Sequence, residues 1–381
     1  MRSAPNRRRR CWIRRLIKPG ATIGVLGSGQ LGRMLGLVAR RYGYRFHVYS
    51  NETDSPAGQI ADREVVGRYD DAALVREFAQ GVDVMTFEFE NVDSACAEAA
   101  EAVTRVRPAG RVLHITQNRI REKSFLRDHG IPVTPFRPVR TAADLEGFAY
   151  PAVLKTADFG YDGKGQRKVG SVEEARVAYA ALGGAEAILE EFIAFRREVS
   201  VVGGRNEQGQ FVHFGVIENE HANHILDVSR GPVAYDHPAL GVAERIFEEL
   251  DVVGVLCVEM FELADGSVLV NELAPRTHNS GHLTIESCDV SQFELQLRTI
   301  CDLPVAMPRY VCGAGAMANL LGDVWSGGEP NWERAIALPV ALHLYGKREP
   351  RAGRKMGHIT AAAATPEEAA ARVRQARALL R

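Results

Sequence analysis

Residues 255–276 read VLCVEMFELADGSVLVNELAPR, and this stretch carries the pattern of a β-hairpin. Two runs rich in β-branched and apolar residues flank Asp265-Gly266, a dipeptide that tolerates the positive φ angles of a two-residue hairpin turn. We therefore predict two antiparallel strands joined at this dipeptide.

The register of this hairpin brings two glutamates together. If Ala264 pairs with Ser267, counting outward places Glu259 directly opposite Glu272, with Cβ atoms roughly 4.5–5.5 Å apart on one face of the sheet. Like charges so placed repel, so we expect a cation between them, and carboxylate oxygens suit Mg²⁺. The pattern predicts a Mg²⁺-nucleotide site. A solvated sheet face with two carboxylates is the alternative, and a longer turn would shift the register.

Length and composition limit the possible classes of protein. A chain of 381 residues is too long for one compact core, so we expect two or three domains. A formal net charge of −1 does not indicate a nucleic-acid-binding or membrane-surface protein, and no apolar run approaches the length of a spanning helix. The cysteines form no C-x-x-C pair, which favours buried thiols in a reducing cytoplasm. They are Cys11, Cys96, Cys257, Cys288, Cys301 and Cys312.

Basic residues are distributed unevenly. The chain has forty arginines and only seven lysines, and four of the lysines fall in motif-like stretches, where a compact ammonium differs from a planar guanidinium. Residues 1–20 are Arg-rich and acid-free and superficially resemble an organellar transit peptide. An upstream-extended translation start explains this segment more simply, and we expect a disordered basic tail outside the fold.

The ordered chain is expected to begin at Ala21 with a strand, a glycine turn, a helix and a second strand. Gly27, Gly29 and Gly32 match G-x-G-x-x-G, the context in which a phosphate can meet a helix N-terminus. Glu52 lies where a dinucleotide fold places its ribose-binding acid, so an NAD-dependent dehydrogenase is one alternative. No nicotinamide-side catalytic pattern follows.

A second strand–helix–strand unit ends in Glu88 and Glu90. Both acids fall at the C-terminal edge of a predicted strand, where ligands bind in open α/β sheets. Simple solvation of the loop is the alternative interpretation.

The segment after residue 115 changes character. A helix ended by His129-Gly130 precedes a buried strand that carries Lys155, and DFGYDGKGQ then leads into another strand. A Walker loop is absent, but a mobile glycine-rich flap can donate backbone N–H groups to phosphates while Lys155 and Lys164 neutralise charge. A plain hairpin turn is the alternative.

Two polar clusters follow. One is RTHNSGH, directly after the glutamate hairpin, where Ser-Gly between His278 and His282 argues against a helical zinc-binding pair, and we interpret these side chains as contacts around a reacting anion. The other is HLYGKREPRAGRKMGH, residues 343–358, a cationic loop that suits a phosphate monoester unless it is merely a solvated basic loop.

Between Ala21 and Ile359 the chain resembles the 5-(carboxyamino)imidazole ribonucleotide synthase family of the ATP-grasp superfamily. The resemblance rests on five strings in chain order: GSGQLGRM, EFENV, GYDGKGQ, NELAPRTHNSGH with SQFE, and YGKREPRAGRKMGH. It implies an α/β and α+β multidomain architecture with an ATP-grasp fold. The implied domains are a Rossmann-like (pre-ATP-grasp) domain over 21–115, an ATP-grasp domain over 116–308 with a lid at about 150–195, and a small β-rich domain over 309–381.

The resemblance also implies a role for particular residues. Glu259 and Glu272 would hold Mg²⁺, and ATP would lie between two antiparallel sheets. The residues expected around ATP are Arg119, Lys155, Gly160, Tyr161, Asp162, Gly163, Lys164, Gly165, Gln166, Glu190, Glu191, Phe192, Ile193, Glu198, His221, Asn271 and Glu272. Those expected around bicarbonate and carboxyphosphate are Tyr161, Asp162, Arg276, His278, Asn279 and His282. Those expected around the ribonucleotide are Gln30, Leu31, Glu88, Lys347, Arg354 and Lys355.

The implied reaction joins bicarbonate, ATP and 5-aminoimidazole ribonucleotide to a carbamate, with a separate mutase acting on the product. The implied protein is cytoplasmic and homodimeric, and it binds no nucleic acid or membrane. Many ATP-grasp enzymes carry an asparagine two residues after the second metal glutamate, whereas this chain has Ala274, which leaves a second Mg²⁺ with few protein ligands. Another ATP-grasp ligase and a non-catalytic ATP sensor are the alternatives. The former would not need the cationic loop, and the latter would not need an intact carboxylate pair and flap.

Overall fold

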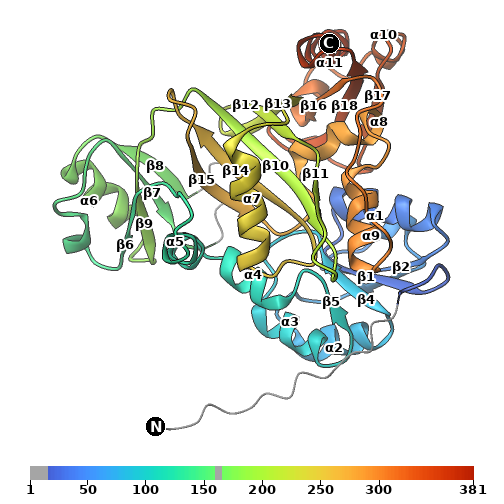
Figure 1. The fold of residues 1–381 in the computed structure, drawn as a ribbon, viewed down its shortest axis with the longest axis horizontal. Helices are drawn as coiled ribbons and strands as arrows, with labels where there is room; N and C mark the ends of the chain where they lie inside the picture. Colours follow the sequence, from blue (N-terminus) through green and yellow to red (C-terminus); the bar gives the residue numbers. More distant parts are fainter. Residues whose placement is uncertain (1–15, 159–164) are drawn as a thin grey trace.

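The computed structural model describes residues 16–158 and 165–381. Three sheets organise these residues, and Figure 1 shows the smallest sheet at one end of the molecule and the N-terminal sheet below the central one. No helix within the described ranges is long and apolar enough to cross a membrane. Positions 160–164 of the predicted flap (160–166) and residues 1–15 of the basic tail lie outside these ranges.

The N-terminal sheet is parallel, with strand order β3-β2-β1-β4-β5. Its strands are β1 (Thr22–Leu26), β2 (Arg45–Ser50), β3 (Arg63–Val66), β4 (Val84–Phe87) and β5 (Arg105–Val106). The accompanying helices are α1 (Gln30–Arg41), α2 (Ala72–Gln80), α3 (Ser94–Glu101) and α4 (Gly110–Thr116). The order reverses between β1 and β4, so the carboxyl edge of the sheet carries the crevice in which such folds bind ligands.

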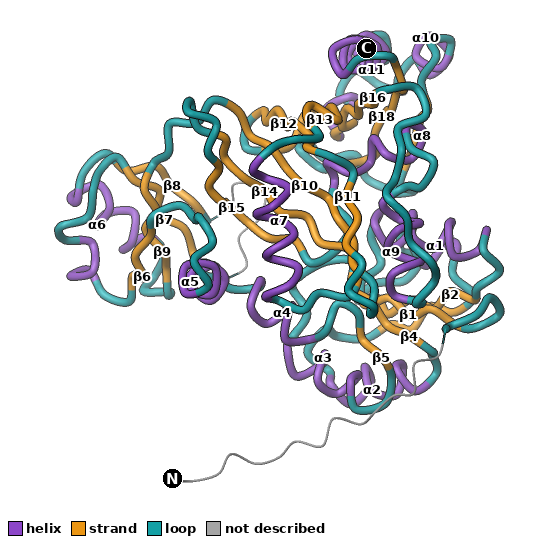
Figure 2. Tube along the Cα trace, viewed as in Figure 1, coloured by secondary structure: helices purple, strands orange, loops and turns teal. Residues whose placement is uncertain are grey.

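The lid is a four-stranded antiparallel sheet with order β6-β9-β7-β8, drawn at the left of Figure 2. Its strands are β6 (Phe136–Val139), β7 (Ala152–Thr156), β8 (Gln166–Val169) and β9 (Ala187–Glu191), and α6 (Val172–Ala181) packs on it. Helix α5 (Arg119–Asp128) lies between the lid and the central sheet and touches strands of both. A helix in this position can bring side chains to a site between the two sheets.

The central sheet has nine strands in the order β15-β14-β10-β12-β13-β16-β18-β17, with β11 paired to β10. The strands are β10 (Arg197–Arg205), β11 (Phe211–His213), β12 (Val216–Ala222), β13 (Ile225–Ala234), β14 (Gly254–Glu262), β15 (Val268–Ala274), β16 (Ala314–Leu321), β17 (Ala341–Leu344) and β18 (Lys355–Ala363). The helices of this half are α7 (Pro238–Glu249), α8 (Thr284–Ser287), α9 (Gln292–Ile300), α10 (Trp332–Ile336) and α11 (Pro366–Ala378). The C-terminal strands therefore continue the sheet that contains the glutamate hairpin.

Helix α9 ties the N-terminal sheet to the central sheet. Its residues Phe293, Leu297 and Ile300 are buried in the same hydrophobic cluster as Leu31 and Met34 of α1, while its other contacts are with β10 and β14. Burial of large apolar side chains, worth about 1.5–3 kcal/mol each, fixes the two sheets against each other.

The turn of the glutamate hairpin is longer than predicted. Leu263 N donates to Ser267 O at 2.9 Å, so the turn has three residues, and it ends at Gly266 with φ of +83°. The prediction of a two-residue turn at Asp265-Gly266 is therefore wrong. The turn has a third residue, and its last position is a glycine in the left-handed region, as is common in three-residue hairpin loops.

The predicted opposition of Glu259 and Glu272 is nevertheless confirmed. Next to the turn Glu262 pairs with Val268, a register that would leave Glu259 opposite Asn271. A bulge at Asn271 shifts the register by one residue and brings Glu272 opposite Glu259. The extra residue in the bulge therefore compensates for the extra residue in the turn, and the two glutamates remain paired as predicted.

The cysteines mostly follow expectation. Cys96, Cys257, Cys288 and Cys301 are buried free thiols, and Cys11 lies outside the described residues. Cys312 is exposed, which corrects the expectation of a buried thiol there, because it lies in the loop that leads into β16 rather than in a strand or helix face.

Candidate active site

The carboxylate pair forms the centre of the candidate site. Glu259 Oε1 lies 3.0 Å from His278 Nε2. Burial would raise the pKa of Glu259, but the charge and hydrogen bond of His278 hold it at about 2, so this carboxylate is ionised. Among the residues that the structure describes, Glu272 has no such partner. Removal from water raises its pKa although the charge of Arg119 opposes this, and the charges of Glu259 and Glu90 raise it further.

The pair fits a magnesium ion bound together with a nucleotide. Two facing carboxylates, one with a pKa raised first by burial and then by a nearby negative charge, are an arrangement that a divalent cation stabilises. Within residues 16–158 and 165–381 no cluster of three or more acidic, histidine or cysteine side chains could hold a metal. Mg²⁺ is commonly bound by one or two carboxylates plus substrate phosphates, so a two-carboxylate site suits it.

Helix α5 supplies two charged residues that the sequence analysis missed. Lys123 is 1% exposed; its Nζ donates to Asn271 O at 3.0 Å and lies 3.5 Å from Glu190 Oε2. Glu122 accepts from Leu273 N at 3.1 Å. These neighbouring side chains therefore bind the backbone groups on both sides of Glu272, where the bulge interrupts the strand ladder. Their spacing from Arg119, i+3 and i+4, was the only signal in the sequence.

The lid contributes Lys155 and Glu190. Lys155 Nζ donates to Glu190 Oε2 at 2.9 Å, and Glu190 is 2% exposed. Burial would raise the pKa of Glu190, but the charges of Lys123 and Lys155 hold it below its usual value. Arg119 also lowers it, so the two cations predicted to approach the ATP phosphates, Arg119 and Lys155, lie beside one buried carboxylate.

The segment predicted to frame the adenine lies at the end of β9. Glu191 N donates to Pro135 O at 2.9 Å and Phe192 N to Pro151 O at 3.1 Å, so these two N–H groups serve the lid itself. The Phe192 ring is 41% exposed, with Lys168 Nζ 3.4 Å from its centroid, and Ile193 follows it. The segment can therefore offer the aromatic face of Phe192 to a base, because its two N–H groups are already used within the lid.

The strands behind the lid hold the expected ribose-side pair. His221 Nδ1 lies 2.5 Å from Glu198 Oε2 on adjacent strands. Burial would lower the pKa of His221, but the hydrogen bond and charge of Glu198 raise it, as does Glu259. The predicted residues Glu198 and His221 therefore lie on the Glu259 side of the sheet. Gly165 and Gln166 stand at the start of β8, and the other flap residues (Gly160, Tyr161, Asp162, Gly163 and Lys164) lie outside the described residues.

The N-terminal sheet meets this site through Glu88 and Glu90. Arg276 Nη2 lies 2.7 Å from Glu90 Oε1. Glu88 accepts hydrogen bonds from Gly29 N and, at 2.8 Å, from Gly32 N. The glycine motif is a context in which a phosphate can meet a helix N-terminus, and here the Glu88 carboxylate occupies the Gly29 and Gly32 N–H groups at the start of α1.

Three of the residues predicted for the ribonucleotide, Gln30, Leu31 and Lys347, lie near Glu88. Burial raises the pKa of Glu88, whereas Gly32 and Gly29 lower it through hydrogen bonds and Arg276 and Lys347 lower it through their charges. Lys347 Nζ donates to Lys355 O at 2.8 Å, and Arg354 Nη1 to Glu349 O at 3.0 Å. The Leu31 side chain is buried in the hydrophobic cluster beside α1, so a ligand would reach only its backbone; Gln30 is partly exposed at the start of that helix.

Buried polar atoms without partners concentrate in the predicted site. Among the residues that the structure describes, eleven buried side-chain nitrogen or oxygen atoms have no hydrogen-bond partner. Six of them belong to predicted site residues, namely Glu190, Asn271, Arg276, Asn279 (two atoms) and His282. Because proteins rarely leave such atoms unsatisfied, this concentration indicates ligand-binding groups.

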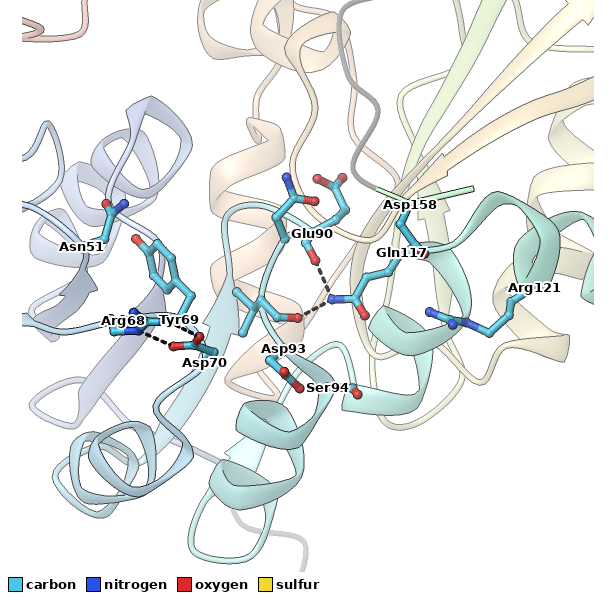
Figure 3. Close-up of a pocket in the computed structure, with 12 residues that line it drawn as sticks. Asn51, Arg68, Tyr69, Asp70, Glu90, Asp93, Ser94, Gln117, Arg121 and Asp158 are labelled. Carbon is cyan, nitrogen blue, oxygen red and sulfur yellow. Dashed lines mark hydrogen bonds and ion pairs between the residues drawn. The ribbon is translucent and has the colours of Figure 1, made fainter. Parts of the chain in front are cut away.

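A cavity of about 610 Å³ opens at the carboxyl edge of the parallel sheet (Figure 3). It borders the candidate site at Glu90 and Asp158, which line it, and Gln117 Nε2 donates to Glu90 O at 2.6 Å. None of the six residues predicted for the ribonucleotide lines it. The lining residues are Asn51, Arg68, Tyr69, Asp70, Glu90, Asn91, Val92, Asp93, Ser94, Gln117, Arg121 and Asp158.

Three family descriptions match successive parts of the chain. They are the ribonucleotide synthetase preATP-grasp domain over residues 20–117, the ATP-grasp domain over 124–293 and the phosphoribosylaminoimidazole carboxylase C-terminal domain over 315–372. The fold and the site therefore define an ATP-grasp ligase, and the predicted fold class is confirmed.

Individual relatives narrow this class. The chain is 41% identical over 358 residues to the N5-carboxyaminoimidazole ribonucleotide synthase of Brucella melitensis, covering 90% of this chain and 97% of that protein. It is 40% identical over 355 residues to the enzyme of the same name from Bacillus subtilis, covering 91% and 93%. The chain belongs to the N5-carboxyaminoimidazole ribonucleotide synthase family, as its sequence motifs indicated.

Solved structures agree with this assignment. The ADP complex of an N5-carboxyaminoimidazole ribonucleotide synthetase superposes with a TM-score of 0.88 at 39% identity, over 96% of this chain and 98% of that one. The Aspergillus clavatus N5-carboxyaminoimidazole synthase in complex with ADP and 5-aminoimidazole ribonucleotide gives 0.85 at 31% identity, over 95% and 99%.

Proposed function

We propose that this chain carboxylates 5-aminoimidazole ribonucleotide with bicarbonate and ATP, releasing ADP and phosphate, in purine biosynthesis. The observation that carries the proposal is a continuous series of cations beside three carboxylates. Arg119 and Lys155 interact with Glu272, and Arg276 and His278 interact with Glu259. Arg276 also interacts with Glu88, together with Lys347 of the cationic loop.

The chemistry proceeds in two transfers. First, a bicarbonate oxygen attacks the γ-phosphorus of ATP; a P–O bond forms, the bond to ADP breaks, and carboxyphosphate results. Next, the exocyclic amine of the ribonucleotide attacks the carboxyl carbon, the C–O bond to phosphate breaks, and the amine loses a proton. Phosphoryl transfer of this kind depends on positioning and on cations placed where charge develops.

The chain's own residues provide that positioning. Lys155 and Arg119 would neutralise the ATP phosphates, and Arg276 and His278 would bind the bicarbonate and carboxyphosphate oxygens. Glu259 and Glu272 would hold Mg²⁺, which would supply positive charge where negative charge develops on the phosphate oxygens. The cationic loop would hold the ribonucleotide phosphate through Arg354, Lys347 and Lys355.

Further parts of the proposal concern the protein's partners. A carbamate of this kind is labile, so we expect a separate mutase to consume it, and we propose a homodimer in the cytoplasm. Oligomeric state can be measured directly by light scattering on the purified chain.

The decisive experiment measures ADP release with Mg-ATP and bicarbonate, with and without 5-aminoimidazole ribonucleotide. Strong stimulation by the ribonucleotide, together with a requirement for bicarbonate, is the expected result. If the rate of ATP turnover does not depend on the ribonucleotide, the chain is still an ATP-grasp enzyme, but this ribonucleotide is not its substrate. Other amines and acids would then be screened.

A further inference from the structure

A buried glutamine connects the two histidines of the RTHNSGH segment. Gln292 begins α9 and is fully buried. Its Oε1 accepts from His278 N at 2.9 Å, while its Nε2 lies 2.7 Å from His278 O and 2.9 Å from His282 Nδ1. All of its amide hydrogen-bonding groups are therefore used within this segment.

The partners fix the orientation of the amide. A backbone N–H can only donate, so the group facing His278 N must be the amide oxygen. A backbone carbonyl can only accept, so the group facing His278 O must be the amide nitrogen. The same nitrogen then donates its second hydrogen to His282 Nδ1.

This orientation determines the tautomer of His282. A ring nitrogen that accepts an N–H carries a lone pair, so the proton of the neutral imidazole resides on Nε2. Burial lowers the pKa of His282 well below its usual value, and the nearby charges of His278, His343, Lys355 and Arg276 lower it further. The ring is therefore a neutral donor, and its buried Nε2 has no hydrogen-bond partner among the described residues.

Packing also holds the ring in one position. The Phe293 ring lies with its centroid 5.6 Å from that of His282, and the His358 ring lies 4.6 Å away. Gly281 leaves space for the glutamine, because a Cβ atom there would lie 2.4 Å from Gln292 Oε1. With the edge bound by Gln292 and both flanks packed, the direction of the Nε2–H bond is set before any ligand arrives.

We propose that Gln292 is a positioning residue that fixes His282 as a neutral Nε2–H donor for an oxygen of bicarbonate or carboxyphosphate. The ligand part of this inference rests on the proposed function, whereas the tautomer does not. A neutral donor near Arg276, His278 and Lys355 binds an oxyanion without adding another positive charge. Because Nε2 already carries a proton, His282 does not take the proton that the attacking amine releases, and the departing phosphate is left as an acceptor.

The test is ¹⁵N NMR of protein labelled at its eleven histidines, with His282 assigned by loss of its signals in His282→Asn. In the wild-type protein at pH 7.5, we expect His282 to show a protonated Nε2 and an unprotonated Nδ1. In Gln292→Glu the carboxylate still accepts from His278 N but can no longer donate, so the His282 proton should move to Nδ1. We expect kcat to fall about 100-fold, the effect of removing one donor to a developing oxyanion, with the KM for ATP nearly unchanged.

Gln296→Glu is the matched control, because Gln296 is equally buried one turn later on α9 and accepts from Val255 N at 2.6 Å. Its Nε2 donates to the Thr86 hydroxyl, which can rotate and donate to a carboxylate instead. A wild-type spectrum with Nδ1–H or imidazolium at His282 would overturn the inference without any variant. If the His282 tautomer changes in Gln292→Glu but kcat stays at the wild-type value, His282 does not act as a donor in the reaction. Absence of ribonucleotide-stimulated ADP release with the expected tautomer would count against the proposed function alone.

Discussion

Glu259 and Glu272 face each other across β14 and β15 because a bulge at Asn271 compensates for the third residue of the turn. The bulge also frees the backbone groups on both sides of Glu272, and α5 binds them through Glu122 and Lys123. The position of the second carboxylate is therefore determined by a helix that is 150 residues away in sequence, as well as by its own hairpin.

Glu272→Gln tests the metal site. Removing one of two facing carboxylates should weaken Mn²⁺ binding, used as a spectroscopic substitute for Mg²⁺, by at least the roughly 10- to 100-fold seen when a supporting residue of a metal site is lost. The binding is measured by electron paramagnetic resonance in the presence of ADP. Glu98→Gln, an exposed glutamate of α3, is the control and should bind Mn²⁺ normally. Equal binding by all three proteins would rule out Glu272 as a ligand.

Lys123→Met tests the buried ammonium. The substitution leaves Glu190 with Lys155 as its remaining partner and leaves Asn271 O without its donor, so we expect a loss of roughly 3–5 kcal/mol in the free energy of unfolding. Urea denaturation measures this loss. The exposed Lys18→Met should change stability by no more than about 0.5 kcal/mol. A change in Lys123→Met as small as that of the control would mean that the ammonium has no stabilising role.

The local sequence pattern was sufficient to predict those parts of the site that are formed by one continuous stretch of chain. The hairpin, the lid strand with Lys155 and the cationic loop were all predicted from their own residues. Lys123 was not, because nothing within α5 reveals that β9 and β15 pack on it and exclude water. Glu88 illustrates the same limit, since the glycine motif marks a place where an anion can meet the start of α1 but does not reveal that the carboxylate there comes from a side chain 59 residues later. The bulge at Asn271 has no signal in the sequence and was not predicted, although the pairing of Glu259 with Glu272 that results from it was.

Arg354→Ala tests the assignment of the cationic loop. Loss of a guanidinium that binds the ribonucleotide phosphate should raise the KM for 5-aminoimidazole ribonucleotide by about 10- to 100-fold, or roughly 1.5–3 kcal/mol for a charged hydrogen bond, and leave the KM for ATP nearly unchanged. Arg351→Ala is the matched control, because this exposed arginine of the same loop is paired with Glu349. Equal effects of Arg354→Ala on both KM values would contradict the assignment.

His358→Phe tests the buried histidines. Burial lowers the pKa of His358 well below its usual value, and protonation of the neighbouring His282 or His343 ring would lower it further. The unfolded chain therefore binds a proton below about pH 6.5 that the folded chain does not bind, so stability falls as the pH decreases through this range, by about 1.4 kcal/mol per pH unit for each such group. Removing His358 should reduce this slope by that amount in urea denaturation between pH 7.5 and pH 5.

The control for this measurement is His114→Gln, at an exposed histidine of α4, which should leave the slope unchanged. The absolute stability of His358→Phe will also fall, because the variant loses the 2.8 Å hydrogen bond to Tyr345. The slope is the quantity that decides, and an unaltered slope would show that His358 titrates normally in the folded protein.

The pairing of β13 with β16, from Val228 opposite Ala318 to Gly231 opposite Gly315, has a consequence for substrate choice. It places the strand of Glu259 and the strand that begins at Lys355 in one hydrogen-bonded sheet, so no hinge lies between these two ends of the reaction centre. The lid and the N-terminal strands form sheets of their own. A substrate that occupies both ends must match a distance built into the backbone. Molecules with the right amine but a shorter or longer arm to the phosphate would then be discriminated by length, a property that no single side chain determines.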